Sequence, residues 1–225
     1  MTISVSDGNI ILKTSQDGTN TLFNISIGEH YHSVFGAYTE SQHVFITNGL
    51  NYSIKNSIKI LEIGFGTGLN AFLSMIEGYK NKRNIFYESI ELYPLMPDIT
   101  DILNYPDLIA PSFSSQFLKM HKCEWNKQIT ITEGFILKKI SGDALKVNFG
   151  NGFDVVFFDA FSPEKQPELW DKRMFEKIYK VMNESGVLIT YCAKGLVKRV
   201  LKLAGFKVER IPGPPGKRHM LRGIK

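Results

Sequence analysis

Three glycines at alternate positions, Gly64, Gly66 and Gly68, lie between an apolar stretch and a predicted helix. Glycines at such a junction allow a tight turn, a close approach of a ligand to the backbone, and use of the N–H groups at the helix start. Dinucleotide-binding loops usually have the spacing GxGxxG, which suits a pyrophosphate. Here the spacing is GxGxG, and the preceding Glu62 would repel a pyrophosphate but receive an ammonium group. The loop therefore predicts a site for S-adenosylmethionine, which has an ammonium group and a ribose but no phosphate.

Two more acidic residues follow the next two predicted strands. Glu91 ends the strand over 85–91, 23 residues after Gly68, and an acid at about 20 residues beyond such a loop is placed to bind both ribose hydroxyls. Glu88 is the competing choice, but it falls within the strand rather than at the carboxyl end, where ligands bind. Asp143 follows the strand over 135–141, and we expect it to accept a hydrogen bond from the adenine amino group. Taken alone, its Gly-Asp pair also suits an ordinary turn or helix cap.

Asp159 lies at the end of the predicted strand over 153–159, which is apolar enough to be a buried central strand. A charged residue there is costly unless it has partners or a function. The loop Asp159-Ala-Phe-Ser-Pro163 resembles the Asn/Asp-Pro-Pro-Tyr/Phe loops of amine-directed methyltransferases. Methyl transfer requires a neutral, aligned amine, whereas an alkylamine with a pKa of about 10 is mostly protonated at neutral pH. We expect Asp159 to orient the nitrogen lone pair and to stabilise the ammonium that forms; the alternative is that it only caps the following turn.

The residues expected at the cofactor are Glu62, Gly64, Phe65, Gly66, Gly68, Asn70, Glu91, Asp143 and Asp159. Phe161 and Trp170 have the shape to line a pocket for a flat base, although for either one alone core packing is the stronger interpretation. His30, Tyr31 and His32 either cover the substrate entrance or, as we favour, pack in the ordinary way. The five histidines show no metal-ligand spacing, and we expect no metal.

Strands and helices alternate from residue 57 onwards. Strands are predicted at 58–63, 85–91, 128–132, 135–141, 153–159, 186–192, 206–211 and 219–224, and helices at 68–79, 95–104, 111–121, 167–182 and 194–204. This alternation argues for a mainly parallel sheet covered by helices on both faces. The last two strands are joined by Pro212-Gly-Pro-Pro-Gly216, which is too short for a crossover helix, so they must pair antiparallel. The predicted fold class is therefore α/β, a Rossmann-like class I S-adenosylmethionine-dependent methyltransferase.

The first 50 residues precede this pattern. Residues 9–14 and 21–26 are apolar runs joined by a turn at 16–19, where Asp17-Gly18 is a strong hairpin signal. A helix is expected near 40–48. We predict an N-terminal β-hairpin and helical extension over 1–50 and a methyltransferase core over 51–225, within a single domain overall. The extension is expected to form a flap near the substrate.

Size and composition bound the class of protein. The chain has 225 residues, 43% hydrophobic and 22% charged, which suits one full α/β core. No apolar run approaches the roughly 20 residues that cross a bilayer, and the N-terminus lacks the pattern of a signal peptide. Cys123 and Cys192 have no CxxC spacing and are expected to be reduced. These observations predict a cytoplasmic protein, with no membrane partner and a monomer favoured.

Four segments, 62–70, 88–94, 159–170 and 216–221, look like the methyltransferase domain of the bifunctional tRNA 5-methylaminomethyl-2-thiouridine biosynthesis proteins. The pattern Asp-x-Phe-x-Pro-x-Lys-x-Pro-x-x-Trp of 159–170 is much more specific than the glycine loop. The resemblance, which extends over residues 15–224, implies methylation of the primary amine of 5-aminomethyl-2-thiouridine at the tRNA wobble position, with S-adenosylmethionine as the donor. It also implies cofactor roles for Gly64, Gly66, Gly68, Glu91 and Asp143, and a role for Asp159 at the amine.

The chain departs from that family in two ways. The usual Asp-Gly-Phe-Ala-Pro is Asp159-Ala-Phe-Ser-Pro163 here, a mild change that should leave the loop geometry intact. The bifunctional proteins continue into a flavin-dependent oxidoreductase half, whereas this chain ends at Lys225. We therefore expect a stand-alone form without FAD.

Basic residues are concentrated at the C-terminal end. Residues 194–225 contain ten Lys or Arg and one acidic residue, whereas the rest of the chain is net acidic. Such a distribution is typical either of a polyanion-binding surface or of solvated lysines on a helix and edge strands. With tRNA as the expected partner, these residues would carry its phosphates while the wobble base is flipped towards Asp159. The expected acceptor residues are Phe161, Pro163, Lys165, Trp170, Lys194, Lys198, Lys217 and Arg218, with Arg199, Lys202 and Arg222 near the last four.

Two other interpretations stay open. A small-molecule amine methyltransferase, or a relative of the polyamine aminopropyltransferases, would share the glycine loop but should not need a basic C-terminal surface. A non-catalytic tRNA-binding module would retain S-adenosylmethionine as a structural ligand and would show no turnover for Asp159→Asn to abolish.

Overall fold

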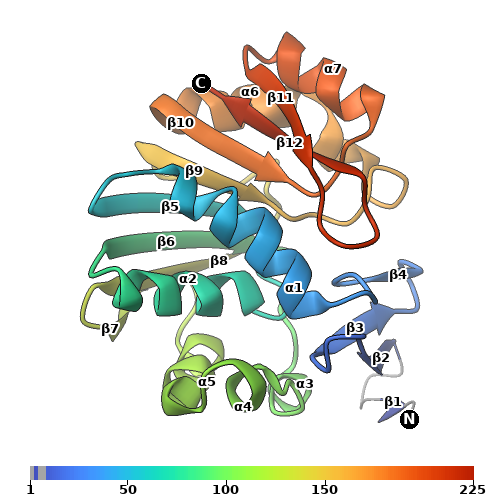
Figure 1. Cartoon of the computed structure of the whole chain (residues 1–225), viewed down its shortest axis with the longest axis vertical. Coiled ribbons are helices and arrows are strands. Elements are labelled where there is room, and N and C mark those ends of the chain that lie inside the picture. The colour runs from blue at the N-terminus through green and yellow to red at the C-terminus, as the bar shows by residue number, and fades with distance from the viewer. Residues whose placement is uncertain (1–2, 5–8) are drawn as a thin grey trace.

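The computed structural model describes residues 3–4 and 9–225 and is built around an eight-stranded sheet (Figure 1). The strands are β5 (Ser57–Ile63), β6 (Asn84–Glu91), β7 (Gln128–Thr132), β8 (Phe135–Ser141), β9 (Phe153–Phe158), β10 (Met182–Thr190), β11 (Lys207–Pro212) and β12 (His219–Ile224). Their order is β11-β12-β10-β9-β5-β6-β8-β7. The run from β10 to β8 is parallel throughout, so these carboxyl ends share one edge of the sheet. The strand order changes direction at β5, which is where open sheets of this kind form a ligand-binding crevice.

The predicted antiparallel pairing of the last two strands is confirmed. β11 and β12 pair antiparallel from Lys207 opposite Ile224 to Pro212 opposite His219. β12 also pairs antiparallel with β10, so it is inserted between β10 and β11. Because β12 begins beside the carboxyl end of β10, the turn over 213–218 lies at the same edge as the ends of the parallel strands.

Helices cover both faces of the large sheet, as predicted. One core contains residues of α1 (Ala37–Ser41), α2 (Leu69–Lys80) and α5 (Ser114–Lys122), and the other contains residues of α6 (Lys172–Val181) and α7 (Gly195–Leu203). Val155 and Phe157 of β9 belong to the first core, and Val156 and Phe158 belong to the second. The strand is apolar at successive positions because both of its faces are covered. No helix in the described part of the chain is both long and apolar enough to span a membrane.

The predicted helix over 95–104 is wrong in extent. It is reduced to α3 (Pro97–Thr100), and a separate α4 (Tyr105–Ile109) follows. Pro97 and Pro106 lie in the first turns of these helices. A proline is tolerated in a first turn but cannot continue a helix from the preceding residues, so the segment divides in two.

Other element ends also differ from the prediction. The helices predicted at 111–121 and 167–182 begin as 3-10 turns, Pro111–Phe113 and Pro167–Trp170. α6 starts after Asp171, whose side chain caps it by accepting from the Met174 N–H at 3.0 Å. The helix expected near 40–48 is α1 followed by a π-helical segment, Gln42–Thr47, and β10 begins at Met182 rather than at 186.

The predicted N-terminal hairpin is confirmed as β2 (Ile10–Thr14) and β3 (Asn20–Asn24). Two short strands, β1 (Ile3–Ser4) and β4 (Glu29–His30), extend it to a four-stranded sheet, and each is too short to show a periodicity. Asp17 joins the hairpin turn to α1, because its Oδ2 accepts from both the N–H and the hydroxyl of Thr39 at 2.9 Å. In Figure 1 this small sheet lies on the same side of the molecule as the turn between β11 and β12.

Asp17→Asn is expected to lower the free energy of unfolding by about 1 kcal/mol at neutral pH. Burial raises the pKa of Asp17, but hydrogen bonds from Thr19, Thr39 and Ser15 outweigh it and lower the pKa from 3.8 to about 2. Because the folded-state pKa is the lower one, this stabilisation is present above a pH of about 4 and is lost as the pH falls towards about 2. Urea titrations should show a difference between variant and wild type that shrinks below a pH of about 4; a difference independent of pH would contradict the assignment.

Candidate active site

A cavity of about 420 Å³ opens at the carboxyl edge of the parallel strands. It is lined by residues at the ends of β5, β6, β9 and β10, by the N-terminal sheet with α1, and by Lys217 from the turn between β11 and β12. In the described part of the chain, no group of three or more His, Cys, Asp or Glu is placed to hold a metal ion. The cavity is therefore formed by the strand ends of the large sheet together with the N-terminal sheet, α1 and the turn before β12.

The glycine loop turns sharply where β5 ends. Gly64, Gly66 and Gly68 have φ angles of 94°, 49° and 72°, in the left-handed region that favours glycine. A Cβ at Gly64 would lie 2.7 Å from the main-chain oxygen of Asp159, so a close approach also demands glycine there. α2 begins directly after Gly68 with no capping side chain, which leaves N–H groups of its first turn available to a ligand.

Glu91 is the acid that the fold brings to the glycine loop. Its Oε2 accepts from the N–H of Gly66 at 2.9 Å and its Oε1 from the N–H of Tyr93 at 2.8 Å. Burial raises the pKa of Glu91 in spite of these hydrogen bonds. The competing Glu88 forms an ion pair with Lys138 at 3.0 Å and does not line the cavity.

Phe65 and Asp143 also line the cavity. Phe65 packs edge-on against His121, with 5.5 Å between ring centroids. Asp143 accepts a hydrogen bond from the N–H of Leu145 at 2.9 Å and pairs with Lys146 at 3.3 Å. Asp143 thus makes the turn that its sequence context allows and faces the cavity as well.

Asn70 links the buried carboxyl group of Glu62 to the partly buried carboxyl group of Asp159. Its Nδ2 donates to Glu62 at 3.1 Å and to Asp159 at 2.8 Å, and the hydroxyl of Ser89 donates to Glu62 at 2.6 Å. Burial raises the pKa of Glu62 to about 8. Glu62 is wholly buried and does not line the cavity, whereas Asn70 and Asp159 do. Asn70 therefore lies between Glu62 and the cavity. We expected Glu62 to contact the cofactor directly.

Asp159 is held where the cavity meets the glycine loop. Its N–H donates to the oxygen of Ile63 at 3.1 Å, which continues the pairing of β9 with β5 by one residue. Burial raises the pKa of Asp159 from 3.8 to about 7; the charge of Glu40 adds to this rise, while Asn70 and Lys217 oppose it. Among the described residues, the turn that follows donates no hydrogen bond to this carboxyl group. The geometry thus disfavours a role as a simple turn cap.

Glu40 is a cavity residue that the sequence analysis missed. It lies in α1, its side chain is 10% exposed, and it accepts from the N–H of Ser33 at 2.8 Å while forming an ion pair with Lys217. One signal was present in the sequence, because Ala37, Glu40 and Val44 have helical spacing and an acid in an apolar stripe is unusual. The short helix gave too little pattern to recognise it.

Glu29 of β4 was missed as well. Its carboxyl group accepts from the hydroxyl of Ser162 at 2.7 Å and from the N–H of Ser162 at 3.2 Å. The N-terminal sheet thereby holds the loop that follows Asp159. A lone glutamate in a two-residue strand carries no sequence signal for this role.

The structure brings only some of the predicted acceptor residues to the cavity. Phe161 lines it and meets Tyr31 edge-on, with 5.1 Å between ring centroids. Trp170 is 3% exposed, and its Nε1 donates to the oxygen of Phe161 at 2.8 Å, so it supports the loop from behind. Trp170 therefore packs in the core, the interpretation favoured for it alone, and does not line the cavity as the base-pocket alternative required. Pro163 and Lys165 also lie outside the cavity lining.

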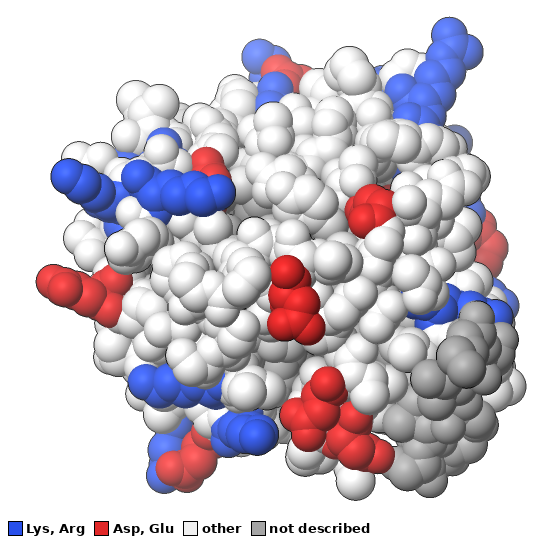
Figure 2. All heavy atoms as spheres, turned by 60° about the horizontal axis from the view of Figure 1, so that its bottom comes forward, with Lys and Arg blue, Asp and Glu red and all other residues white. Residues whose placement is uncertain are grey.

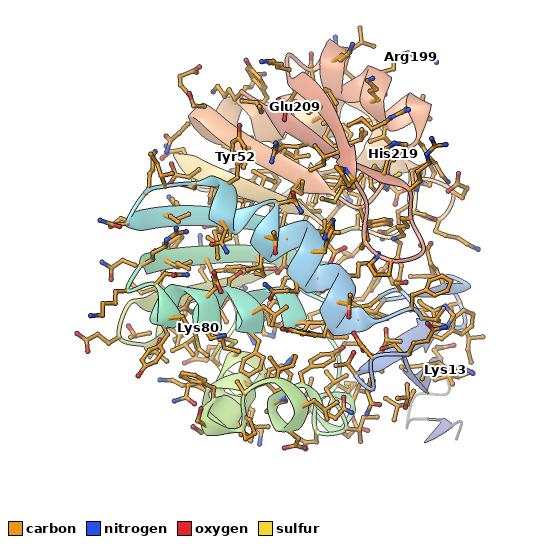
Figure 3. The ribbon with its side chains drawn as sticks, in the orientation of Figure 1. Lys13, Tyr52, Lys80, Arg199, Glu209 and His219 are labelled. Carbon is orange, nitrogen blue, oxygen red and sulfur yellow. The ribbon has the colours of Figure 1, made fainter. Side chains whose placement is uncertain are left out.

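Several of the basic residues predicted to contact phosphate have acidic partners instead. The pairs are Lys194 with Glu164, Lys217 with Glu40, and Arg222 with Glu209. The guanidinium of Arg222 also lies 4.0 Å from the ring centroid of Tyr52, and Figure 3 labels Tyr52 and Glu209. Among the described residues, no ion pair involves Lys198 or Arg199 of α7, or Arg218. The prediction for Lys217 is corrected, because its ammonium lies in the cavity rather than on a phosphate-facing surface.

Comparison with known families identifies the class of protein that this fold and cavity define. A profile of S-adenosyl-L-methionine-dependent methyltransferases matches residues 109–225. The chain therefore belongs to this family of S-adenosyl-L-methionine-dependent methyltransferases.

Curated relatives include the tRNA 5-methylaminomethyl-2-thiouridine biosynthesis bifunctional proteins MnmC of Burkholderia thailandensis and Leptospira interrogans. The first is 32% identical over 217 residues, covering 87% of this chain and 32% of the relative. The second is 33% identical over 219 residues, covering 86% and 32%. The chain thus spans about a third of the length of these relatives.

Among solved structures, MnmC2 from Aquifex aeolicus matches with a TM-score of 0.76 and 28% identity, covering 94% of this chain and 69% of that chain. Spermidine synthase from Thermotoga maritima matches with a TM-score of 0.58 and 14% identity, covering 96% and 68%. The second likeness is one of fold alone.

Gly64→Ala is expected to weaken the binding of S-adenosylhomocysteine, the demethylated cofactor, by about tenfold or more, because the new methyl group must displace Asp159 or the loop. Calorimetric titration measures the affinity. Gly195→Ala is the matched control, since a Cβ there meets nothing within 4 Å. Equal affinities for the two variants would contradict the close approach.

Asp159→Asn is expected to make the ligand-free protein more stable than the wild type by roughly 1–2 kcal/mol above a pH of about 7. The folded-state pKa of this acid is raised, so its ionisation costs stability progressively as the pH rises from about 4 through about 7. The two proteins should be equally stable at a pH of about 4, where the carboxyl group is protonated in the folded state. Thermal unfolding at both pH values tests this; a pH-independent difference would refute it.

Proposed function

We propose that this methyltransferase methylates the primary amine of 5-aminomethyl-2-thiouridine at the tRNA wobble position, giving 5-methylaminomethyl-2-thiouridine. The names of the bifunctional relatives support this acceptor. The observation that carries the proposal is the position of Asp159, a partly buried carboxyl group that lines the cavity beside the glycine loop, with Asn70 donating to it at 2.8 Å. A carboxyl group in this position is able to accept a hydrogen bond or a proton from an amine that lies next to the cofactor.

The residues present fit S-adenosylmethionine. Gly64, Gly66 and Gly68 provide the close backbone approach, and Glu91 presents a carboxyl group at the end of β6. The buried Oδ1 of Asn70 has no hydrogen-bond partner within the described residues and is free to accept from an N–H donor. When bound, the cofactor supplies an electrophilic methyl group on a positively charged sulfur. This chemistry is a displacement at carbon that requires neither a flavin nor a metal.

Asp159 would act on the acceptor nitrogen. In its ionised form the carboxylate accepts an N–H of the amine and keeps the lone pair directed away from itself, towards the reacting carbon. The same carboxylate then stabilises the ammonium produced on the nitrogen. A pKa of about 7 leaves Asp159 partly ionised at neutral pH, so it is also able to take the proton that the amine must lose and pass it to solvent, which returns the carboxylate before methyl transfer. Glu29 and Trp170 hold the Asp159–Ser162 loop so that this geometry is rigid.

The remaining basic residues suit contact with tRNA phosphates. Lys198, Arg199 and Lys202 lie on α7 and Arg218 lies on the turn beside Lys217. Figure 3 shows Arg199 pointing outward from α7. On the face shown in Figure 2, which brings the lower part of the molecule forward, Lys and Arg lie mostly towards the edges, several of them beside acidic groups, and acidic groups lie nearer the middle. An acceptor of this kind would place the reaction in the cytoplasm.

The activity test uses labelled S-adenosylmethionine and bulk tRNA that lacks the modification. Label is expected in methylaminomethyl-uridines after digestion to nucleosides. Asp159→Asn should reduce kcat/KM by about 100-fold or more while S-adenosylhomocysteine affinity is retained. Label in a free small amine, or in another nucleoside, would overturn the acceptor. Absence of turnover in the wild type would favour a tRNA-binding module.

The tRNA surface is tested by the salt dependence of affinity. The logarithm of the association constant should fall linearly with the logarithm of salt concentration. Replacing Lys198, Arg199 and Arg218 by Met should reduce the slope by about 0.7–0.9 for each phosphate that the variant no longer neutralises. Lys80→Met, on α2 and labelled at the opposite side of the molecule in Figure 3, is the matched control. A slope unaffected by the triple variant would refute this surface.

A further inference from the structure

A primary ammonium group already lies in the cavity. Lys217 pairs with Glu40, and its Nζ lies 4.1 Å from the ring centroid of Tyr191. Glu40, Tyr191, Lys217 and Asp159 all line the same cavity. A carboxylate and an aromatic face are the two groups that together recognise an alkylammonium ion.

Both recognition groups are held by contacts that do not involve Lys217. One oxygen of Glu40 accepts from the N–H of Ser33 at 2.8 Å, which leaves the other for the ammonium. The hydroxyl of Tyr191 donates to the oxygen of Ala160, next to Asp159, at 2.9 Å, which fixes its ring beside the catalytic loop. The receptor is therefore preformed rather than created by the lysine.

Lys217 is the more exposed member of the ion pair. Its side chain is 34% exposed, whereas that of Glu40 is 10% exposed. It extends from the turn over 213–218, beside the exposed Gly216 and Arg218. A lysine has a flexible four-carbon stem, so its ammonium can leave the cavity without any movement of β12.

We infer that Glu40 and the ring of Tyr191 form an alkylammonium subsite, which Lys217 occupies in the free protein and which an aminoalkyl acceptor takes over when the lysine moves out. The inference rests on the proposed function for the identity of that acceptor, since the end of a lysine and an aminomethyl group are both –CH₂–NH₃⁺. No covalent bond changes in this step; one cation replaces another.

The exchange also provides specificity. Once Lys217 has left, Glu40 is a largely buried carboxylate without a counter-charge, which is costly unless a new cation arrives. An acceptor that carries a methyl or hydroxymethyl group in place of the aminomethyl group brings no such cation. The subsite therefore selects for the charged amine and delivers it beside Asp159, where it loses its proton before reaction.

The test measures binding of a simple cation, n-butylammonium, with n-butanol as the neutral control, to the full chain saturated with S-adenosylhomocysteine. Lys217→Met should bind n-butylammonium about tenfold more tightly than the wild type, with n-butanol affinity unchanged. Glu40→Gln added to Lys217→Met should abolish the gain, because the amide keeps the hydrogen bond from Ser33 but not the charge. Lys207→Met, an exposed lysine on β11, controls for the loss of one positive charge and should bind like the wild type.

Three results would overturn the subsite: no gain in Lys217→Met, an equal gain for n-butanol, or a gain that survives Glu40→Gln. Unchanged S-adenosylhomocysteine affinity verifies that each variant is folded; if Glu40→Gln fails this check, Tyr191→Leu in the Lys217→Met background provides the same readout. The measurement contains neither tRNA nor methyl transfer. A failure of the tRNA acceptor in the activity test would thus leave this result standing, and the reverse also holds.

Discussion

The pairing of β5 with β9 is the constraint on which the active site depends. It places Ile63 opposite Phe158, so the glycine loop and the Asp159 loop leave the sheet side by side. The contact is close enough that a Cβ at Gly64 would lie 2.7 Å from the oxygen of Asp159. A shift of one residue in this register would exchange the residues that β9 presents to the two cores and carry Asp159 away from the cavity.

The carboxyl groups gathered at this edge make the cavity suited to cations. Burial raises the pKa values of Glu62, Glu91 and Asp159. Ionisation of these acids in the ligand-free protein therefore lowers the free energy of unfolding. A ligand with a positive charge lowers these pKa values again, because an opposite charge nearby favours the ionised form of an acid. A sulfonium donor is a cation, and the proposed amine acceptor is also a cation at neutral pH, so the excess of acids matches both.

Closure of the cavity depends on two parts of the chain outside the parallel strands. The N-terminal sheet holds the loop that follows Asp159 through Glu29, and α1 provides Glu40. The turn before β12 provides Lys217, because β12 is inserted antiparallel beside β10 and its turn returns to the carboxyl edge. The antiparallel hairpin is therefore part of the site as well as part of the fold.

The sequence by itself determined the glycine loop, the succession of strands and helices, and the position of Glu91, Asp143 and Asp159 at the ends of strands. Each of these depends on a local pattern: a residue spacing, an alternation, or a polar residue at the end of an apolar run. It did not determine that Glu62 lies behind Asn70, or that Lys217 points into the cavity. These facts depend on which side chains meet across long stretches of chain, as in the pair of Lys217 and Glu40, 177 positions apart. Only the tertiary structure decided them, because a basic residue has the same local pattern whether it faces solvent or a buried acid.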